Sequence, residues 1–374
     1  MRQGQLGEFV DFAYGKGLPA RNRKPGSIPV FGSAGCVDTH DEALVEGPGV
    51  IIGRKGTVGA VHWSDSDFYP IDTTYYVISK SDELRLRYVY YLLITLPLQY
   101  MNTDVAVPGL NKMNALRLKV TIASPSKQDR IIDILSAYDD LIENNRRRIQ
   151  LLEQSARLLY KEWFVHLRFP GHEHVKIKDG IPEGWEICTI ADTGNIVTGK
   201  TPSKKRKSYY GDDVPFIKTP DMHGNTVVTS TEEKLSEEGA NSQANKTLPP
   251  RSVLVSCIGT VGAVAFNAAS AQTNQQINAI VPKSYALRYW IFFMAKTLKP
   301  LLEGMGGGAT MANVNKSKFS SMRVVIPSKL MLAQFNFVVT PIIDQIEQLA
   351  LMNVHLSNSR DLLLPRLMKG KIAV

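Results

Sequence analysis

The chain has 374 residues, of which 44% are hydrophobic and 21% charged, so it can build ordinary cores and is not a disordered protein. Its formal net charge of +9 favours a polyanionic partner, most simply nucleic acid, although a basic enzyme would show the same balance. Three scattered cysteines without a Cys-x-x-Cys exclude a disulfide framework and a zinc site, and the absence of a secretory signal or a long apolar run predicts a cytoplasmic protein.

The sequence contains an internal repeat, because several segments occur twice in the same order. Each copy has a Gly-Lys pair followed by a basic cluster, GKGLPARNRK in the first and GKTPSKKRK in the second, and Pro19 aligns with Pro202. The other paired landmarks are GTVGAV at residues 56–61 and 259–264, LRY at 86–88 and 287–289, and Asn-Lys at 111–112 and 315–316. The second copy carries extra residues around MHGNTVVTSTEEKLSEEGANSQ. Several landmarks in one order predict two similar domains.

Within each copy the pattern predicts mixed α/β structure. GVIIGRKGTVGAVHW and SVLVSCIGTVGAVAF each indicate two strands joined by a glycine-bounded turn, and TTYYVIS and INAIVP indicate further strands. RYVYYLLITLPL and RYWIFFMAKTLKPLL predict short buried helices, and each Asn-Lys pair leads into a short strand. Strands and helices do not alternate regularly, which argues against a doubly wound sheet.

Each copy ends in a long helix. Residues 126–167 contain no glycine and no proline, and apolar residues recur there at steps of three and four. The predicted seam comprises Ile134, Tyr138, Leu141, Asn145, Ile149, Leu152 and Leu159 in the first helix, and Ile342, Ile346, Leu349, Asn353, Leu356 and Leu363 in the second. We expect the two helices to form an antiparallel intramolecular coiled coil between two similar α/β domains with pseudo-two-fold symmetry; the alternative is one amphipathic helix on each domain. The predicted divisions are 1–125 (first α/β domain), 126–168 (central long helix), 169–326 (connector and second α/β domain) and 327–374 (C-terminal long helix).

Residues 194–201, GNIVTGKT, match the phosphate-binding loop G-x-x-x-x-G-K-T of ATPases. That loop needs a helix beginning at its Lys-Thr, whereas Pro202 and a polar run follow here. The first copy keeps only Gly15-Lys16 at the aligned position. ATP binding is therefore disfavoured, and no other segment predicts a catalytic or metal site.

The repeated basic clusters predict contacts with DNA phosphates, against the alternative of solvated charged loops. Three amide side chains in the second copy are candidates for reading base edges, and equally for capping strands. The complete set of predicted DNA-binding residues is Lys16, Arg21, Arg23, Lys24, Arg54, Lys55, Lys112, Lys200, Lys204, Lys205, Arg206, Lys207, Tyr209, Asn274, Gln275, Gln276 and Lys316.

In their order and duplication these landmarks resemble the specificity subunit of type I restriction–modification enzymes. Supporting segments are NQQINAIVP, GLNKMNALRLKVTIASPSKQDRI with its match NVNKSKFSSMRVVIPS, and RDLLLPRLMKGKI. The resemblance implies a non-catalytic DNA reader whose two recognition domains each bind half of a split target, with the helices setting the spacer. It also implies two methyltransferase subunits that use S-adenosylmethionine and two restriction subunits that use ATP and Mg²⁺, with no cofactor in this chain. A P-loop ATPase and a coiled-coil adaptor that binds only protein remain the alternatives.

Overall fold

The computed structural model describes residues 2–101, 109–305 and 313–372. The chain divides into two compact units: unit 1 comprises residues 1–141 and 356–374, and unit 2 comprises residues 142–355. Unit 1 therefore combines both ends of the chain. The domain limits proposed from the sequence assign each long helix a range of its own and stay a prediction.

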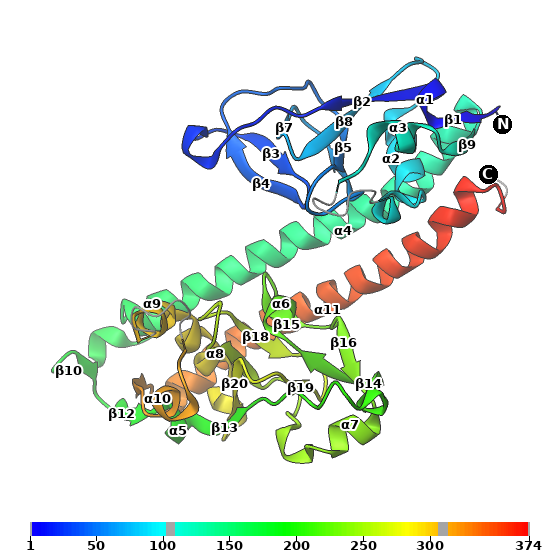
Figure 1. The fold of residues 1–374 in the computed structure, drawn as a ribbon. Coiled ribbons are helices and arrows are strands. Elements are labelled where there is room, and N and C mark those ends of the chain that lie inside the picture. The colour runs from blue at the N-terminus through cyan, green and yellow to red at the C-terminus, as the bar shows by residue number, and fades with distance from the viewer. Residues whose placement is uncertain (1, 102–108, 306–312, 373–374) are drawn as a thin grey trace. The chain divides into compact units, whose positions relative to one another are not determined.

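Unit 1 is built on a four-stranded antiparallel sheet with the strand order β2-β8-β5-β6. Helix α2 packs on β5 (Figure 1) and also on β6, and every residue of β5 is buried. A second sheet has the order β4-β3-β7, in which β3 and β7 are parallel, and β1 pairs with β9. The elements are β1 (Arg2–Gln5), α1 (Leu6–Phe9), β2 (Val10–Tyr14), η1 (Ala20–Asn22), β3 (Ile28–Gly32), β4 (Gly35–His40), β5 (Gly49–Gly53), β6 (Val61–Ser64), β7 (Tyr69–Pro70), β8 (Thr74–Ser79), α2 (Leu86–Ile94), η2 (Leu98–Tyr100), α3 (Lys112–Leu116) and β9 (Lys119–Ile122).

Unit 2 repeats this topology. Its main sheet has the order β13-β20-β17-β18 and gains a fifth strand, β15, from the extra residues of the second copy. The second sheet, β16-β14-β19, again contains one parallel pair, β14 with β19, and β12 pairs with β21. The two similar α/β domains predicted from the repeat are thus confirmed. The elements are β10 (Ile177–Lys178), β11 (Ile181–Pro182), β12 (Glu186–Thr189), α5 (Ile190–Thr193), β13 (Gly194–Thr198), η5 (Lys207–Tyr209), β14 (Tyr210–Ile217), α6 (Thr219–Met222), β15 (Val227–Val228), β16 (Glu233–Leu235), α7 (Glu237–Asn241), η6 (Ala244–Lys246), β17 (Val253–Ser256), β18 (Val264–Asn267), β19 (Gln272–Thr273), β20 (Ile277–Pro282), η7 (Tyr285–Leu287), α8 (Arg288–Thr297), α9 (Lys299–Met305), α10 (Lys316–Ser320) and β21 (Arg323–Ile326).

The two long helices are present. Helix α4 spans Pro125–Tyr160 and continues as a π-helical turn over Lys161–Val165, and α11 spans Lys329–Met368. In unit 2 their segments run antiparallel, because Asn145 hydrogen-bonds Asn353 (2.9 Å) while the Tyr160 ring lies 6.2 Å from Phe335. In unit 1 the last turns of α11 enter the core of the α/β domain. That core includes Ile131 and Leu135 of α4 together with Leu364, Leu367 and Met368.

The seam residues stay a prediction, and burial along the helices departs from the predicted stripe at several positions: Ile343 and Leu364 are buried where the prediction has Ile342 and Leu363. Leu141 is 50% exposed, and the neighbouring Ile142 is buried instead. Asn145, Ile346 and Leu349 are buried as proposed, and the other predicted seam residues are half-buried. Those half-buried residues are Ile134, Tyr138, Ile149, Leu152, Leu159, Ile342, Asn353, Leu356 and Leu363. The helices pack on the recognition domains as well as on each other, so the buried stripe is wider than a two-helix seam and its centre is shifted.

Candidate nucleic-acid interface

The Gly-Lys pair of each copy follows the first strand of the main sheet and is held in the same way. In unit 1 the Gly15 amide donates to the Thr74 carbonyl (3.1 Å) and the Lys16 amide to the Pro70 carbonyl (3.0 Å). In unit 2 Gly199 donates to Ile277 (3.1 Å) and Lys200 to Thr273 (2.9 Å). The part of GNIVTGKT that recurs therefore has an equivalent structural position in both units.

Close backbone approach explains the glycine. A methyl group on Gly15 would lie 2.1 Å from the Ile71 carbonyl oxygen, and one on Gly199 would lie 2.1 Å from that of Asn274. Both distances are far inside van der Waals contact, so any other side chain displaces the loop.

The ATPase interpretation of residues 194–201 is wrong. Gly194–Thr198 forms β13, paired in register with β20 from Gly194 opposite Pro282 to Thr198 opposite Asn278. A phosphate loop needs free amides and a helix that starts at the lysine. Here the amides belong to a sheet, and the next helical turn after Lys200 is the 3₁₀ turn Lys207–Tyr209.

The residues that lead into the GTVGAV turn lie at the same end of the main sheet. The Arg54 and Lys55 backbone amides donate to the Thr73 carbonyl (2.8 and 3.1 Å), and Thr73 directly precedes β8, whose first residue, Thr74, accepts the hydrogen bond from Gly15. In unit 2 the Cys257 amide donates to the Gln276 carbonyl (2.7 Å). We call these surfaces edge 1 and edge 2. Edge 1 comprises residues 14–16, 54–55 and 71–73, and edge 2 comprises residues 199–201, 257–258 and 274–276.

Edge 1 presents a guanidinium group fixed against aromatic rings. The Arg54 guanidinium carbon lies 5.3 Å from the centre of the Tyr14 ring and 5.9 Å from that of Tyr75, and its Nη2 donates to the Asp72 carbonyl (2.8 Å). Burial, with the neighbouring Tyr14, raises the pKa of Tyr75 to about 12, so the phenol stays protonated. Lys16 and Lys55 are exposed and form no ion pair within the part of the chain that the structure describes. The edge combines fixed positive charge with an exposed aromatic face, the two elements of a nucleic-acid contact.

Edge 2 presents amides instead. Asn274 is buried; its Oδ1 accepts from the Gln276 amide (3.1 Å) and its Nδ2 donates to the Gln276 Oε1 (3.0 Å). These two side chains are thus engaged in the loop itself, as in the strand-capping alternative. Gln275 is exposed, and its Oε1 accepts from the Thr201 hydroxyl (2.7 Å), which leaves the Gln275 amide nitrogen directed to other acceptors.

The basic cluster of unit 1 is partly neutralised within its own unit. Arg23 pairs with Asp38 (3.0 Å) and Lys24 with Asp41 (3.5 Å). A hydrogen bond from the Thr39 amide, together with Arg23, lowers the pKa of Asp38. Arg21 is exposed, and no ion pair involves it among the described residues.

In unit 2, Lys204 pairs with Glu233 (3.2 Å). Burial alone would raise the pKa of Glu233, but hydrogen bonds from Lys204 and Lys218 hold it below its ordinary value. Arg206 donates to the hydroxyl of Tyr209 (2.6 Å) and stacks on its ring. Lys200, Lys205 and Lys207 are exposed, and within the described ranges none of them forms an ion pair. These three lysines are available to phosphates.

The repeated Asn-Lys pairs begin short helices. Asn111 accepts from the Asn114 amide (3.1 Å) and Asn315 from the Lys318 amide (2.9 Å), so each asparagine is a helix N-cap. The lysines that follow differ in their surroundings. Lys112 pairs with Asp11 (2.8 Å) and lowers the pKa of that carboxyl, whereas Lys316 is exposed.

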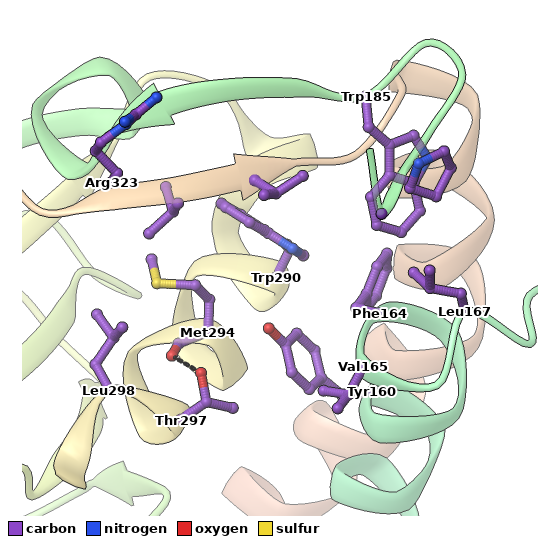
Figure 2. A pocket seen from close by; sticks show the side chains of 14 residues that line it. Tyr160, Phe164, Val165, Leu167, Trp185, Trp290, Met294, Thr297, Leu298 and Arg323 are labelled. Atoms are coloured by element: carbon purple, nitrogen blue, oxygen red, sulfur yellow. Dashed lines mark hydrogen bonds between the residues drawn. The ribbon is translucent and has the colours of Figure 1, made fainter. Parts of the chain in front are cut away.

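The aromatic cavity in unit 2 has a different character. It encloses about 420 Å³ between the end of α4, α8 and β21. Figure 2 shows the side chains of Tyr160, Trp290 and Met294 at its centre, and among the described residues that line the cavity Arg323 alone is charged. Such a lining suits neither a phosphate nor acid–base chemistry.

The described ranges contain no group of three or more His, Cys, Asp or Glu residues that could hold a metal ion. No helix in those ranges is long and apolar enough to span a membrane.

Comparison with known proteins accounts for the duplicated arrangement. Residues 1–154 and 182–334 match the type I restriction modification DNA specificity domain. The type I restriction enzyme HindI specificity subunit of Haemophilus influenzae is 31% identical over 378 residues, covering 83% of this chain and 82% of that protein. The chain belongs to the family of type I restriction–modification specificity subunits.

Two further similar proteins share less of their sequence with this chain. The EcoR124I/EcoR124II specificity subunit of Escherichia coli is 24% identical over 275 residues, covering 71% of this chain and 66% of that protein. The crystal structure of the type I restriction–modification S subunit from M. genitalium has the same fold, with a TM-score of 0.60 at 15% identity over 98% of this chain and 95% of that one. The sequence similarity thus identifies the family, and the fold agrees with it.

Sequence reasoning missed several residues that form or support the two edges of this specificity subunit. Tyr14 and Tyr75 hold Arg54, Thr201 orients Gln275, and the buried Gln243 donates to the Lys200 carbonyl (2.8 Å). Tyr14 directly precedes the repeated Gly-Lys pair, which was a usable signal. Gln243 lies in the extra residues of the second copy, where the first copy offers no counterpart.

Proposed function

We propose that this specificity subunit reads a bipartite, asymmetric DNA target, with one half-site bound by the recognition domain of each unit. One observation carries the proposal: edge 1 and edge 2 have the same backbone construction but different outward side chains. Arg54 on aromatic rings and Gln275 beside Thr201 are distinct hydrogen-bonding groups. Groups that differ in this way discriminate different bases in the major groove, which suits two unlike half-sites.

In this proposal phosphate contacts come from the unpaired lysines of each unit, and the antiparallel helices set the unspecified spacer between the half-sites. Fixed protein groups at two places on a duplex demand a fixed separation along it. Four residues added to each helix lengthen it by about 6 Å, close to two base pairs.

The chain itself would be non-catalytic and without cofactor, and would work in the cytoplasm. We propose that it assembles with two methyltransferase subunits, which bind S-adenosylmethionine and methylate adenine, and with two restriction subunits, which use ATP and Mg²⁺. The outer faces of the long helices supply surface for such partners. The family assignment and the type I enzymes named for its relatives support this arrangement.

The decisive experiment exchanges residues 183–326 for the corresponding segment of another specificity subunit and maps methylated adenines in cells that carry the cognate methyltransferase. We expect a split target in which one half changes and the other half and the spacer stay. A change in both halves, or methylation without a split target, would contradict the two-reader proposal.

A second experiment measures the salt dependence of duplex binding with the methyltransferase present. Replacing Lys200, Lys205 and Lys207 by glutamine should weaken binding to all sequences and reduce the salt slope by roughly 0.9 for each phosphate that is no longer neutralised. The matched control replaces Lys176 and Lys178 of the connector, which lie away from the recognition edges in sequence, and should leave the slope unchanged. An altered base preference would instead identify the lysines as readers.

A further inference from the structure

Asp139 of helix α4 is the meeting point of three donors in unit 1. Its Oδ2 accepts from the Tyr91 hydroxyl (2.6 Å) and from Arg87 Nη2 (3.1 Å), and its Oδ1 accepts from Arg360 Nη1 (2.7 Å). Arg87 and Tyr91 belong to α2 of the recognition domain, and Arg360 belongs to α11. One carboxylate therefore joins the recognition domain to both long helices.

The joint is shielded from water. The side chains of Asp139, Arg87 and Arg360 are 14%, 18% and 26% exposed. Arg87 also lies over the Trp63 ring at 4.6 Å, which restricts its movement. Burial raises the pKa of Tyr91, and the hydrogen bond to Asp139 raises it further, so the phenol remains a donor. Partly buried, charge-assisted hydrogen bonds of this kind are directional and strong.

Further polar contacts join α4 to the start of α2: the Arg85 backbone amide donates to Gln128 Oε1 (2.9 Å), and the Arg85 side chain pairs with Asp129 (2.9 Å). The contacts that α11 adds to this core are apolar. Leu135 of α4 and Leu364 and Leu367 of α11 are buried in the same core as α2. Apolar packing is non-directional and tolerates small shifts of one helix along another. The Asp139 group extends the directional contacts to α11, through Arg360, where the packing on the core is otherwise apolar.

Unit 2 is joined differently. Arg288, which occupies the place of Arg87 in the second copy, stacks on Tyr285 at 4.9 Å, and its Nε has no hydrogen-bond partner in the described part of the chain. In unit 2, ion pairs between the domain and a long helix are formed by Arg251, which contacts Asp344 (2.8 Å) and Glu347, both on α11. A carboxylate that receives donors from the domain and from both helices is thus a feature of unit 1.

We propose that Asp139 is a positioning residue that fixes the first recognition domain on the helix pair and thereby narrows the range of spacer lengths that the enzyme accepts. The proposal rests on the proposed reading of a bipartite target. Removing the charge takes away the one carboxylate that Arg87 and Arg360 share and leaves each with its own exposed partner, Asp65 (4.0 Å) and Asp361 (2.9 Å). The domain then gains freedom to shift along the helices. A half-site displaced by one base pair then becomes easier to engage.

The test uses the complete methyltransferase assembly with Asp139→Asn, which keeps the shape of the side chain, and Arg360→Gln, which removes the donor from α11. Asp140→Asn is the matched control, because Asp140 is exposed and adjacent and makes no ion pair among the described residues. Initial methylation rates are measured on duplexes with both half-sites and the natural spacer, and on duplexes with one base pair more or fewer.

We expect the rate on altered spacers relative to the natural spacer to rise in Asp139→Asn and Arg360→Gln, by on the order of tenfold for the removal of one charge-assisted hydrogen bond. Asp140→Asn should keep the unaltered ratio. A uniform fall on all duplexes, with an unchanged ratio, assigns Asp139 a purely structural role and overturns the proposal. If the unmodified assembly itself shows no spacer preference, the proposed function fails before this inference is reached.

Discussion

Replacing Gly59 by alanine tests whether the repeated GTVGAV turn is a packed structural turn. Gly59 has φ +74°, and a methyl group placed on it would lie 2.4 Å from the carbonyl carbon of Leu98 and 2.4 Å from the amide nitrogen of Gln99. Those atoms are backbone, so they cannot turn aside as a flexible side chain does. The alanine methyl must displace the η2 segment or the turn itself.

Gly56 in the same turn is the matched control. Its φ is +82°, and its methyl group would meet only the Ser33 hydroxyl at 3.1 Å. A left-handed conformation costs an alanine about 1–2 kcal/mol, and both variants bear that cost. Overpacking against fixed atoms adds about 1–3 kcal/mol. We therefore expect Gly56→Ala to destabilise unit 1 by about 1–2 kcal/mol and Gly59→Ala by about 2–5 kcal/mol.

Unit 2 offers an internal comparison. A methyl group on Gly262 would lie 2.6 Å from Cγ and 2.9 Å from Cβ of Lys299. A change of rotamer moves Cγ but leaves Cβ in place, so it relieves only part of the clash, and Gly262→Ala should fall between the other two variants.

The assay is urea unfolding followed by hydrogen exchange and mass spectrometry, which reports on the peptides of each unit separately. Loss of protection in β5 and β6 should occur at lower urea in Gly59→Ala than in Gly56→Ala. Equal urea midpoints for the two variants would refute the packing argument and would indicate that the turn is an open loop available to phosphates.

Three further predictions follow from burial. Leu367→Ala should destabilise unit 1 by about 2–5 kcal/mol and leave exchange in unit 2 unchanged, because Leu367 is 2% exposed in the core of the first recognition domain. Asn145→Leu should lower the free energy of unfolding by about 1–3 kcal/mol, because Oδ1 of the partly buried Asn353 loses its hydrogen-bond donor. Leucine at both positions should recover that stability in a double-mutant cycle, and additive effects of the two substitutions would count against a direct bond. At pH 8 iodoacetamide should label the exposed Cys36 but not Cys257 until unit 2 unfolds. Burial raises the pKa of Cys257 to about 11, so little thiolate forms at that pH. Equal labelling of both cysteines in the folded protein would contradict the burial of Cys257.

Local pattern was sufficient for much of this protein. The repeat predicted two similar domains, alternation and buried runs predicted β5, β8 and their counterparts, and the three–four spacing predicted α4 and α11. Each of these features depends on residues close together in the chain, where 2.0 or 3.6 residues per turn is decided by local sterics. The Asn145 break in the apolar stripe likewise marked a polar contact between helices.

Tertiary structure decided what the pattern left open. Leu364 and Leu367 lie in the core of the first recognition domain, a contact between the ends of the chain that no periodicity encodes. Asn274 and Gln276 satisfy each other, while Gln275 between them stays exposed, although three consecutive amides look alike in sequence. The reason is common to both cases. A residue's type and spacing determine which helix or strand it joins, but its contact partners are set by long-range packing. Those partners decide whether a polar side chain forms its hydrogen bonds within the fold or remains available to DNA.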